Sequence, residues 1–121
     1  MASGEATLRF DNVSKSFVTP AGQLYTAVRG LSFSVGRAEF VSVVGPSGCG
    51  KSTVLNMASG LYQPSSGTVY LDGAPVTDIS LKSAYMFQTD ALLPWKTVLD
   101  NVAIGPIFRG APKREARQQA Q

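Results

Sequence analysis

The chain has 121 residues, of which 44% are hydrophobic and 16% charged, a composition typical of a globular domain rather than a disordered segment. One cysteine excludes an internal disulfide, and a chain without histidine can have neither a histidine base nor a histidine-ligated metal. The net charge of +3 is modest, and the basic residues near the C-terminus fit a solvated helix face better than a surface for RNA or lipid headgroups.

The N-terminal part of the sequence predicts strands. Leu8 and Phe10 alternate with charged residues, and residues 31–35 alternate between apolar residues and serine, so both stretches indicate half-exposed strands. Residues 19–22 contain proline and glycine and predict a turn between them. The run at residues 40–44 is almost entirely apolar, which predicts a strand buried on both faces of a parallel sheet.

A complete G-x-x-x-x-G-K-S phosphate-binding loop follows this apolar run. It consists of Gly45, Pro46, Ser47, Gly48, Cys49, Gly50, Lys51 and Ser52, with Thr53 next. The apolar run before it and the helical periodicity after it form the strand–loop–helix context in which the motif binds a nucleoside triphosphate. The alternative, an ordinary glycine-rich turn before a helix, explains less of this pattern.

The residue types in the loop account for the expected chemistry. Glycines let successive backbone N–H groups point inward as an anion nest, and the following helix adds its positive end. Lys51 is expected to reach the β- and γ-phosphates of ATP, and the Ser52 hydroxyl to ligate Mg²⁺. Thr53 is expected to support the α-phosphate from the first helical turn.

After the loop, apolar residues from Val54 to Leu61 form one helical stripe, and Gly60 indicates the end of the helix. Residues 68–71 predict a strand followed directly by Asp72 and Gly73. That pair favours a tight hairpin turn over a second Mg²⁺ ligand at the strand end. If Asp72 belongs to a turn, the chain has no evident catalytic carboxylate.

The stretch from residue 84 onward predicts another buried strand at 84–87, with Gln88 at its end. Large apolar residues at 92–95, including a tryptophan, then fall in a loop. Such a loop is either a partner surface or a segment packed into its own core, and the sequence leaves both open. Thr97 and Asp100 have the spacing of a capping box, which predicts a helix beginning directly after the threonine.

Five blocks of sequence, taken with their spacing, resemble the ATP-binding subunit of an ATP-binding cassette (ABC) transporter. They are residues 13–17, 45–53, 66–73, 87–95 and 98–102. Within that family, residues 87–102 are most similar to importers of nitrate, sulfonate, taurine or related small solutes.

The resemblance implies an α/β fold with a phosphate-loop NTPase core and an N-terminal antiparallel β subdomain. It implies that Phe17 stacks on adenine, although a core phenylalanine is the alternative, and that Gln88 contacts Mg²⁺ and the attacking water. It also implies two partners: a second ATP-binding subunit, and an integral-membrane permease that meets the region Gln88–Val98. The expected location is cytoplasmic, peripheral on the inner membrane.

The likeness covers about the first half of a typical cassette. The Leu-Ser-Gly-Gly signature, the acidic strand and the switch histidine of the family do not occur in the sequence. Residues 1–121 are therefore expected to form a partial ATP-binding domain, incomplete at its C-terminus, that binds ATP and Mg²⁺ without hydrolysing ATP alone. A noncatalytic regulatory module that associates with a permease is the second hypothesis, and a small phosphotransferase is a distant third.

Overall fold

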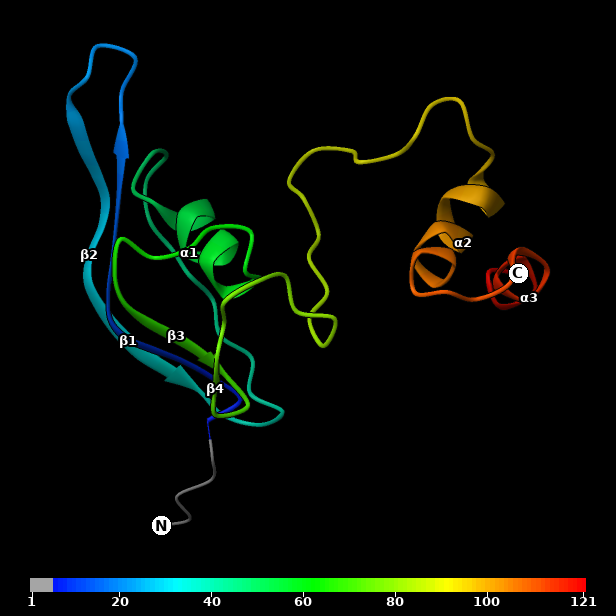
Figure 1. Ribbon diagram of the computed structural model, residues 1–121, viewed down its shortest axis with the longest axis horizontal. Coiled ribbons are helices and arrows are strands. Elements are labelled where there is room, and N and C mark those ends of the chain that lie inside the picture. Colours follow the sequence, from blue (N-terminus) through cyan, green and yellow to red (C-terminus); the bar gives the residue numbers. More distant parts are fainter. Residues whose placement is uncertain (1–5) are drawn as a thin grey trace. The chain divides into compact units, whose positions relative to one another are not determined.

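The computed structural model describes residues 6–121. The chain forms two compact units, one ending at Tyr85 and the other spanning Met86–Gln121 (Figure 1). Each unit is described by itself. None of the described helices is long and apolar enough to cross a membrane.

The first unit is built on a four-stranded antiparallel sheet. Its strands are β1 (Leu8–Val18), β2 (Leu24–Val35), β3 (Ser66–Leu71) and β4 (Ala74–Pro75), in the order β2-β1-β3-β4. Every strand pair among the described residues is antiparallel. This sheet confirms the predicted N-terminal antiparallel subdomain.

Both predicted turns connect neighbouring strands. Residues 19–23 close the β1–β2 hairpin, where the Gly22 N–H donates to the Thr19 carbonyl at 2.8 Å. Asp72 and Gly73 join β3 to β4 with φ angles of 49° and 78°, the positive values that a two-residue type I′ turn requires. The tight turn predicted there is confirmed, and the Asp72 carboxylate lies 3.5 Å from the Lys82 ammonium.

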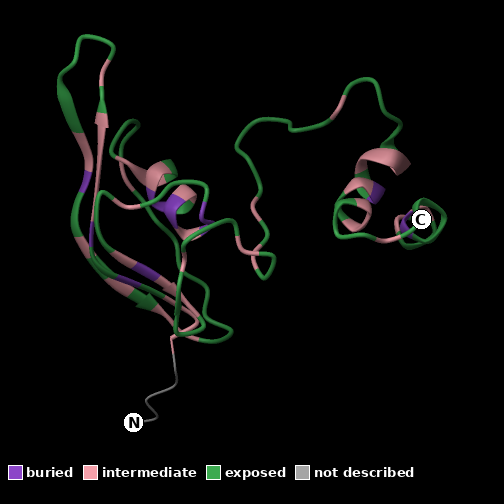
Figure 2. Ribbon diagram, in the orientation of Figure 1, coloured by how far each residue is buried: buried purple, intermediate pink, exposed green. Residues whose placement is uncertain are grey.

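Helix α1 (Lys51–Ala58) packs against the sheet through the core of the unit. In Figure 2 the buried positions lie on the inner side of α1 and on the strands that it covers. Gly60 lies just beyond the helix with φ of 82°, as expected of a glycine that ends a helix. The buried residues of this core are Phe10, Val13, Val28, Val54, Met57 and Val69.

Two predicted strands do not form. Residues 40–44 and 84–87 contain no regular secondary structure, and Phe40 and Met86 are 91% and 93% exposed. A strand needs a neighbour to pair its backbone N–H and C=O groups. Among residues 6–121, neither stretch has a parallel strand beside it. The prediction that these apolar stretches form buried strands is therefore wrong.

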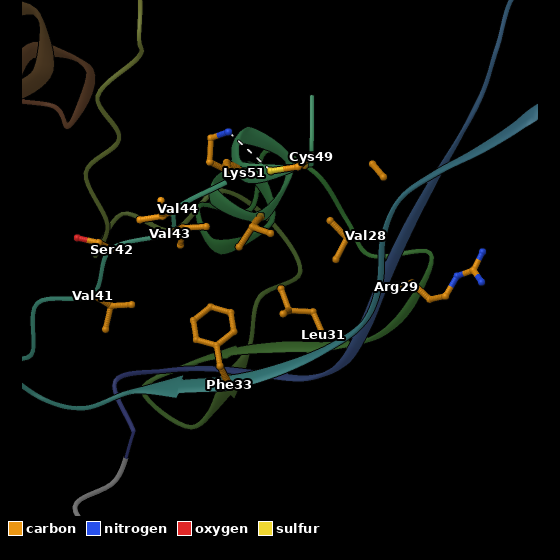
Figure 3. Close-up of a pocket in the computed structure, with 13 residues that line it drawn as sticks. Val28, Arg29, Leu31, Phe33, Val41, Ser42, Val43, Val44, Cys49 and Lys51 are labelled. Carbon is orange, nitrogen blue, oxygen red and sulfur yellow. Dashed lines mark hydrogen bonds between the residues drawn. The ribbon is translucent and has the colours of Figure 1, made fainter. Parts of the chain in front are cut away.

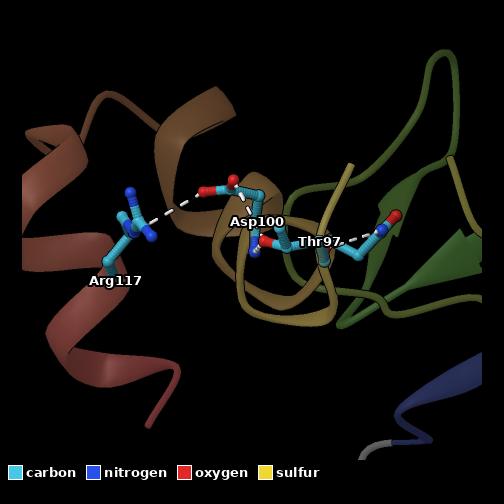
Figure 4. Close-up of polar contacts among 4 residues, drawn as sticks. Thr97, Asp100 and Arg117 are labelled. Atoms are coloured by element: carbon cyan, nitrogen blue, oxygen red, sulfur yellow. Dashed lines mark hydrogen bonds and ion pairs between the residues drawn. The ribbon is translucent and has the colours of Figure 1, made fainter. Parts of the chain in front are cut away.

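The second unit contains α2 (Val98–Phe108) and α3 (Lys113–Gln119). Thr97 is the N-cap of α2, and its hydroxyl accepts a hydrogen bond from the Asp100 N–H at 3.2 Å, which confirms the predicted helix start. Asp100 also faces Arg117 of α3, with 3.6 Å between Oδ1 and Nε (Figure 4). The two helices are thus linked by a charge pair as well as by packing.

Candidate phosphate-binding site

The phosphate loop lies in the first unit, between the exposed residues 40–44 and the first turn of α1. Gly48 and Gly50 have φ of 79° and 99°, a backbone region that side chains other than glycine rarely adopt. A Cβ atom on Gly50 would lie 2.6 Å from the Ala27 carbonyl of β2, and one on Gly45 would lie 2.6 Å from the Cys49 sulfur. Glycine is therefore required for the loop to fold this tightly against β2.

The start of α1 offers unpaired backbone donors. Gly50 is the N-cap, no side chain caps the helix, and its first turn holds no acidic residue. The first helical hydrogen bond runs from the Val54 N–H to the Gly50 carbonyl at 3.0 Å. The N–H groups of the three preceding residues, 51–53, have no partner within the helix. A helix start with free donors and no neighbouring carboxylate favours an anion.

The Lys51 side chain folds back over the loop. Its ammonium donates to the carbonyls of Gly45 and Pro46, both at 2.7 Å, and lies 3.7 Å from the Cys49 sulfur (Figure 3). The positive charge of Lys51 therefore lies over the loop that turns at Gly48 and Gly50. The Lys51 ammonium and the N–H groups at the helix start are both donor types that suit phosphate oxygens.

The residues of the loop are of types that suit Mg²⁺ bound together with a polyphosphate. Within residues 6–121, no group of three or more histidine, cysteine, aspartate or glutamate side chains could hold a metal ion. Protein sites commonly hold Mg²⁺ through one or two side chains, water and substrate phosphates. The exposed Ser52 hydroxyl in the first turn of α1 suits that arrangement.

A cavity of about 570 Å³ lies next to the loop, and most of the residues that line it are apolar. Figure 3 shows its walls: Leu31 and Phe33 from β2 face Val41 and Val43 from the segment before the loop. These walls are apolar and would not compensate phosphate charge. The donors of the loop lie at one end of the cavity, where Cys49, Gly50 and Lys51 join its lining.

The other predicted site residues are placed as follows. Pro46 and Ser47 are exposed in the loop, and Thr53 is half-buried in the first turn of α1. Phe17 lies near the end of β1, where its ring meets the Tyr62 ring edge-on at a centroid distance of 5.6 Å. Gln88 is an exposed residue of the second unit, so its contact with Mg²⁺ stays a prediction.

Sequence reasoning missed one side chain near the loop. The Tyr25 hydroxyl of β2 lies 3.4 Å from the Gly48 carbonyl. Tyr25 is the cross-strand partner of Phe17. Counting outward from the predicted turn at residues 19–22 would have paired Phe17 with Leu24, because the turn in the structure is one residue longer and ends at residue 23.

Comparison with known proteins agrees with this geometry. The ABC transporter family model matches residues 28–121, which include the whole loop, the later part of the first unit and all of the second unit. The chain belongs to the ABC transporter family.

Individual ABC proteins resemble the chain over nearly its whole length. It is 50% identical over 114 residues to the nitrate import ATP-binding protein NrtD of Synechococcus elongatus, covering 94% of this chain and 41% of that protein. It is 44% identical to the taurine import ATP-binding protein TauB of Chromobacterium violaceum, covering 95% of this chain and 43% of that protein.

Solved ABC structures show the same fold. A dimeric ATP-binding cassette in a post-hydrolysis state with ADP and Pi matches with a TM-score of 0.80 and 33% identity. That match covers 93% of this chain and 53% of the solved chain. The chain thus spans about half the length of the cassettes it matches, or somewhat less.

Proposed function

We propose that the chain is the ATP-binding component of an ABC import system and binds Mg·ATP at Gly45–Thr53. The observation that carries the proposal is the tight loop at the start of α1, where the N–H groups of residues 51–53 have no helical partner and the Lys51 ammonium folds back over the loop. This donor set suits the β- and γ-phosphates, with Ser52 as the side-chain ligand of Mg²⁺ and Thr53 near the α-phosphate. Bound Mg²⁺ would neutralise phosphate charge.

The adenine is proposed to stack on Phe17. The Phe17 ring is held from the side by Tyr62, and the Lys15 ammonium lies 5.2 Å from its centroid. Lys15 also donates to the Gln63 carbonyl at 2.8 Å, which ties the end of β1 to the chain that follows α1. A ring fixed in this way is a suitable stacking platform for a base.

The solute is proposed to be nitrate, a sulfonate, taurine or a similar small molecule. Two related proteins support this range, because one is named for nitrate import and the other for taurine import. This chain would be the ATP-binding component of such a system.

Two protein partners are proposed: a second ATP-binding subunit and an integral-membrane permease. The dimeric cassette structures support the first. The region Gln88–Val98 supports the second, because Leu92, Trp95 and Val98 expose large apolar side chains there. This assembly would place the protein on the cytoplasmic face of the inner membrane, with Gln88 linking permease and nucleotide.

The 121-residue polypeptide is proposed to bind ATP without appreciable hydrolysis. None of residues 6–121 forms the acidic strand end that would supply a catalytic carboxylate, and Asp72 belongs to a turn and pairs with Lys82. A noncatalytic module that docks on a permease through its exposed apolar residues is the alternative. Steady-state turnover that depends on Lys51 and matches an intact cassette would contradict both.

Calorimetric titration with Mg·ATP tests the binding proposal. Lys51→Ala removes a charged donor, so affinity is expected to fall about tenfold or more. Lys82→Ala is the matched control, since Lys82 is an exposed lysine of the same unit that pairs with Asp72. The control is expected to bind within about twofold of the wild type. Failure of the wild-type chain to bind Mg·ATP would refute the proposal.

A further inference from the structure

The end of the β1–β2 hairpin presents two aromatic residues on one face. Phe17 and Tyr25 are direct cross-strand partners, so their side chains lie on the same side of the sheet. The next pair, Ser16 and Thr26, belongs to the opposite side, where the two hydroxyls are 2.9 Å apart. Phe17 and Tyr25 therefore form a short aromatic ledge at the hairpin end.

The phosphate loop rests against β2 beside this ledge. Tyr25 reaches the Gly48 carbonyl with its hydroxyl at 3.4 Å, and Gly50 approaches the Ala27 carbonyl so closely that a Cβ atom would clash. The loop thus contacts β2 at Tyr25 and Ala27, which have one residue between them. Tyr25 consequently lies between the ring proposed to stack on adenine and the loop proposed to hold the phosphates.

Tyr25 also has free surface for a ligand. It is 52% exposed, and its hydrogen bond to Gly48 is long. Lys15 and Tyr62, the other large side chains near Phe17, are instead engaged with Phe17 and with each other. A phenol combines an apolar face with a hydroxyl that both donates and accepts, which suits the face and hydroxyls of a sugar.

We propose that Tyr25 is a nucleotide-contacting residue that forms the wall beneath the ribose, between Phe17 and the phosphate loop. This inference rests on the proposed function, because it requires a nucleotide in that loop. It adds recognition of the nucleoside part to a site whose predicted residues mainly bind phosphate. Tyr25 then favours a nucleoside triphosphate over a bare polyphosphate of the same charge.

The test compares two ligands that share a polyphosphate. Calorimetric titrations of the full chain with Mg·ATP and with Mg·tripolyphosphate measure binding with and without a nucleoside. Tyr25→Ala is expected to weaken Mg·ATP about tenfold, the size of a lost aromatic contact, and to change Mg·tripolyphosphate less than about twofold. Tyr25→Phe keeps the ring and is expected to bind Mg·ATP within about threefold of the wild type.

Leu24→Ala is the matched control, because Leu24 neighbours Tyr25, is 72% exposed and points to the opposite face of the hairpin. It is expected to leave both affinities unchanged. Equal weakening of both ligands by Tyr25→Ala would mean that Tyr25 only braces the Gly48 peptide, and unchanged Mg·ATP binding would mean no contact. Either result overturns the inference.

Two controls separate this test from folding and from the proposed function. Thermal unfolding is measured for each variant, and Tyr25→Leu repeats the comparison if the alanine variant unfolds at a lower temperature. A wild-type chain that binds neither ligand would refute the phosphate site itself. A wild-type chain that binds both ligands, with unchanged affinities in Tyr25→Ala, would refute only the role of Tyr25.

Discussion

The two units of the chain are stabilised by different kinds of contact. The first unit buries apolar side chains from β1, β2, β3 and α1 in one cluster, with Met57 fully buried. Among the described residues of the second unit, the fully buried hydrophobic side chains are alanines, Ala103 and Ala116. This unit also has several polar contacts, among which Asn101 is the main hydrogen-bonding residue.

This difference shows where stability resides. Burying large apolar side chains from distant parts of the chain contributes several times more per residue than a polar contact near the surface. The first unit therefore holds the phosphate loop on a well-packed base. The second unit has a few hydrogen bonds, and several of its large apolar side chains, including Trp95 and Phe108, are exposed. Substitutions in each unit can test this comparison.

The largest effect is expected in the first unit. Met57→Ala removes a fully buried side chain and leaves a cavity, so the free energy of unfolding is expected to fall by about 3 kcal/mol. Met86→Ala is the matched control, because Met86 is almost fully exposed, and it is expected to cost less than about 0.5 kcal/mol. Denaturant unfolding followed by circular dichroism measures both. Equal losses of unfolding free energy in the two variants would contradict the assignment of Met57 to the core.

A smaller effect is expected from the main polar contact of the second unit. The Asn101 Oδ1 accepts from the Leu93 N–H at 2.8 Å, and its Nδ2 lies 3.0–3.2 Å from the carbonyls of Leu93, Lys96 and Thr97. Asn101→Ala is expected to destabilise α2 by about 2 kcal/mol, because backbone groups of the preceding loop lose their partner.

Amide hydrogen exchange measures that loss locally. Exchange in α2 is expected to accelerate, while exchange in β1 stays unchanged. Gln118→Ala, which removes an exposed amide side chain from α3, is the control and is expected to leave both rates as they are. Faster exchange in β1 would show that the units depend on each other more than their separate contacts indicate.

The Thr97 cap should contribute less to the stability of α2 than Asn101 does. The Thr97 hydroxyl accepts from the Asp100 N–H and donates to the Asp100 carboxylate at 3.1 Å. Thr97→Ala is expected to cost about 1 kcal/mol in the stability of α2, and Thr97→Ser to restore most of it. Hydrogen exchange of the first α2 amides gives the measurement. A serine variant as weak as the alanine variant would point to the lost methyl group rather than the cap.

The smallest effect is expected for the pair of Asp100 and Arg117. Their atoms are 3.6 Å apart, which is beyond a hydrogen bond, and the arginine side chain is substantially exposed. Arg117→Gln is expected to cost about 0.5 kcal/mol or less, and the difference from wild type should shrink as salt is added. A large loss that does not respond to salt would show a structural role for this pair.

The units also differ in how well their elements could be predicted. The strand that contains Leu8 and Phe10 was predictable because its pairing partner, β2, follows after a short turn. The turn between β3 and β4 was predictable because Asp72 and Gly73 adopt the positive φ angles that it requires. The cap at Thr97 likewise depends on neighbours a few residues away. Residues 40–44 have an equally strand-like sequence, but their pairing would require partners distant in the chain, and none lies beside them among the described residues.

The sequence by itself determined the phosphate loop, because glycines at fixed spacing before a helix permit the positive φ angles that the loop requires. It also determined the hairpin turns and the caps, whose chemistry is local. Only the tertiary structure decided that β2 supports the loop through Tyr25 and Ala27, and that the apolar residues 40–44 are exposed. Strand register and burial depend on contacts between distant segments, and neither is encoded in the residues of one segment alone.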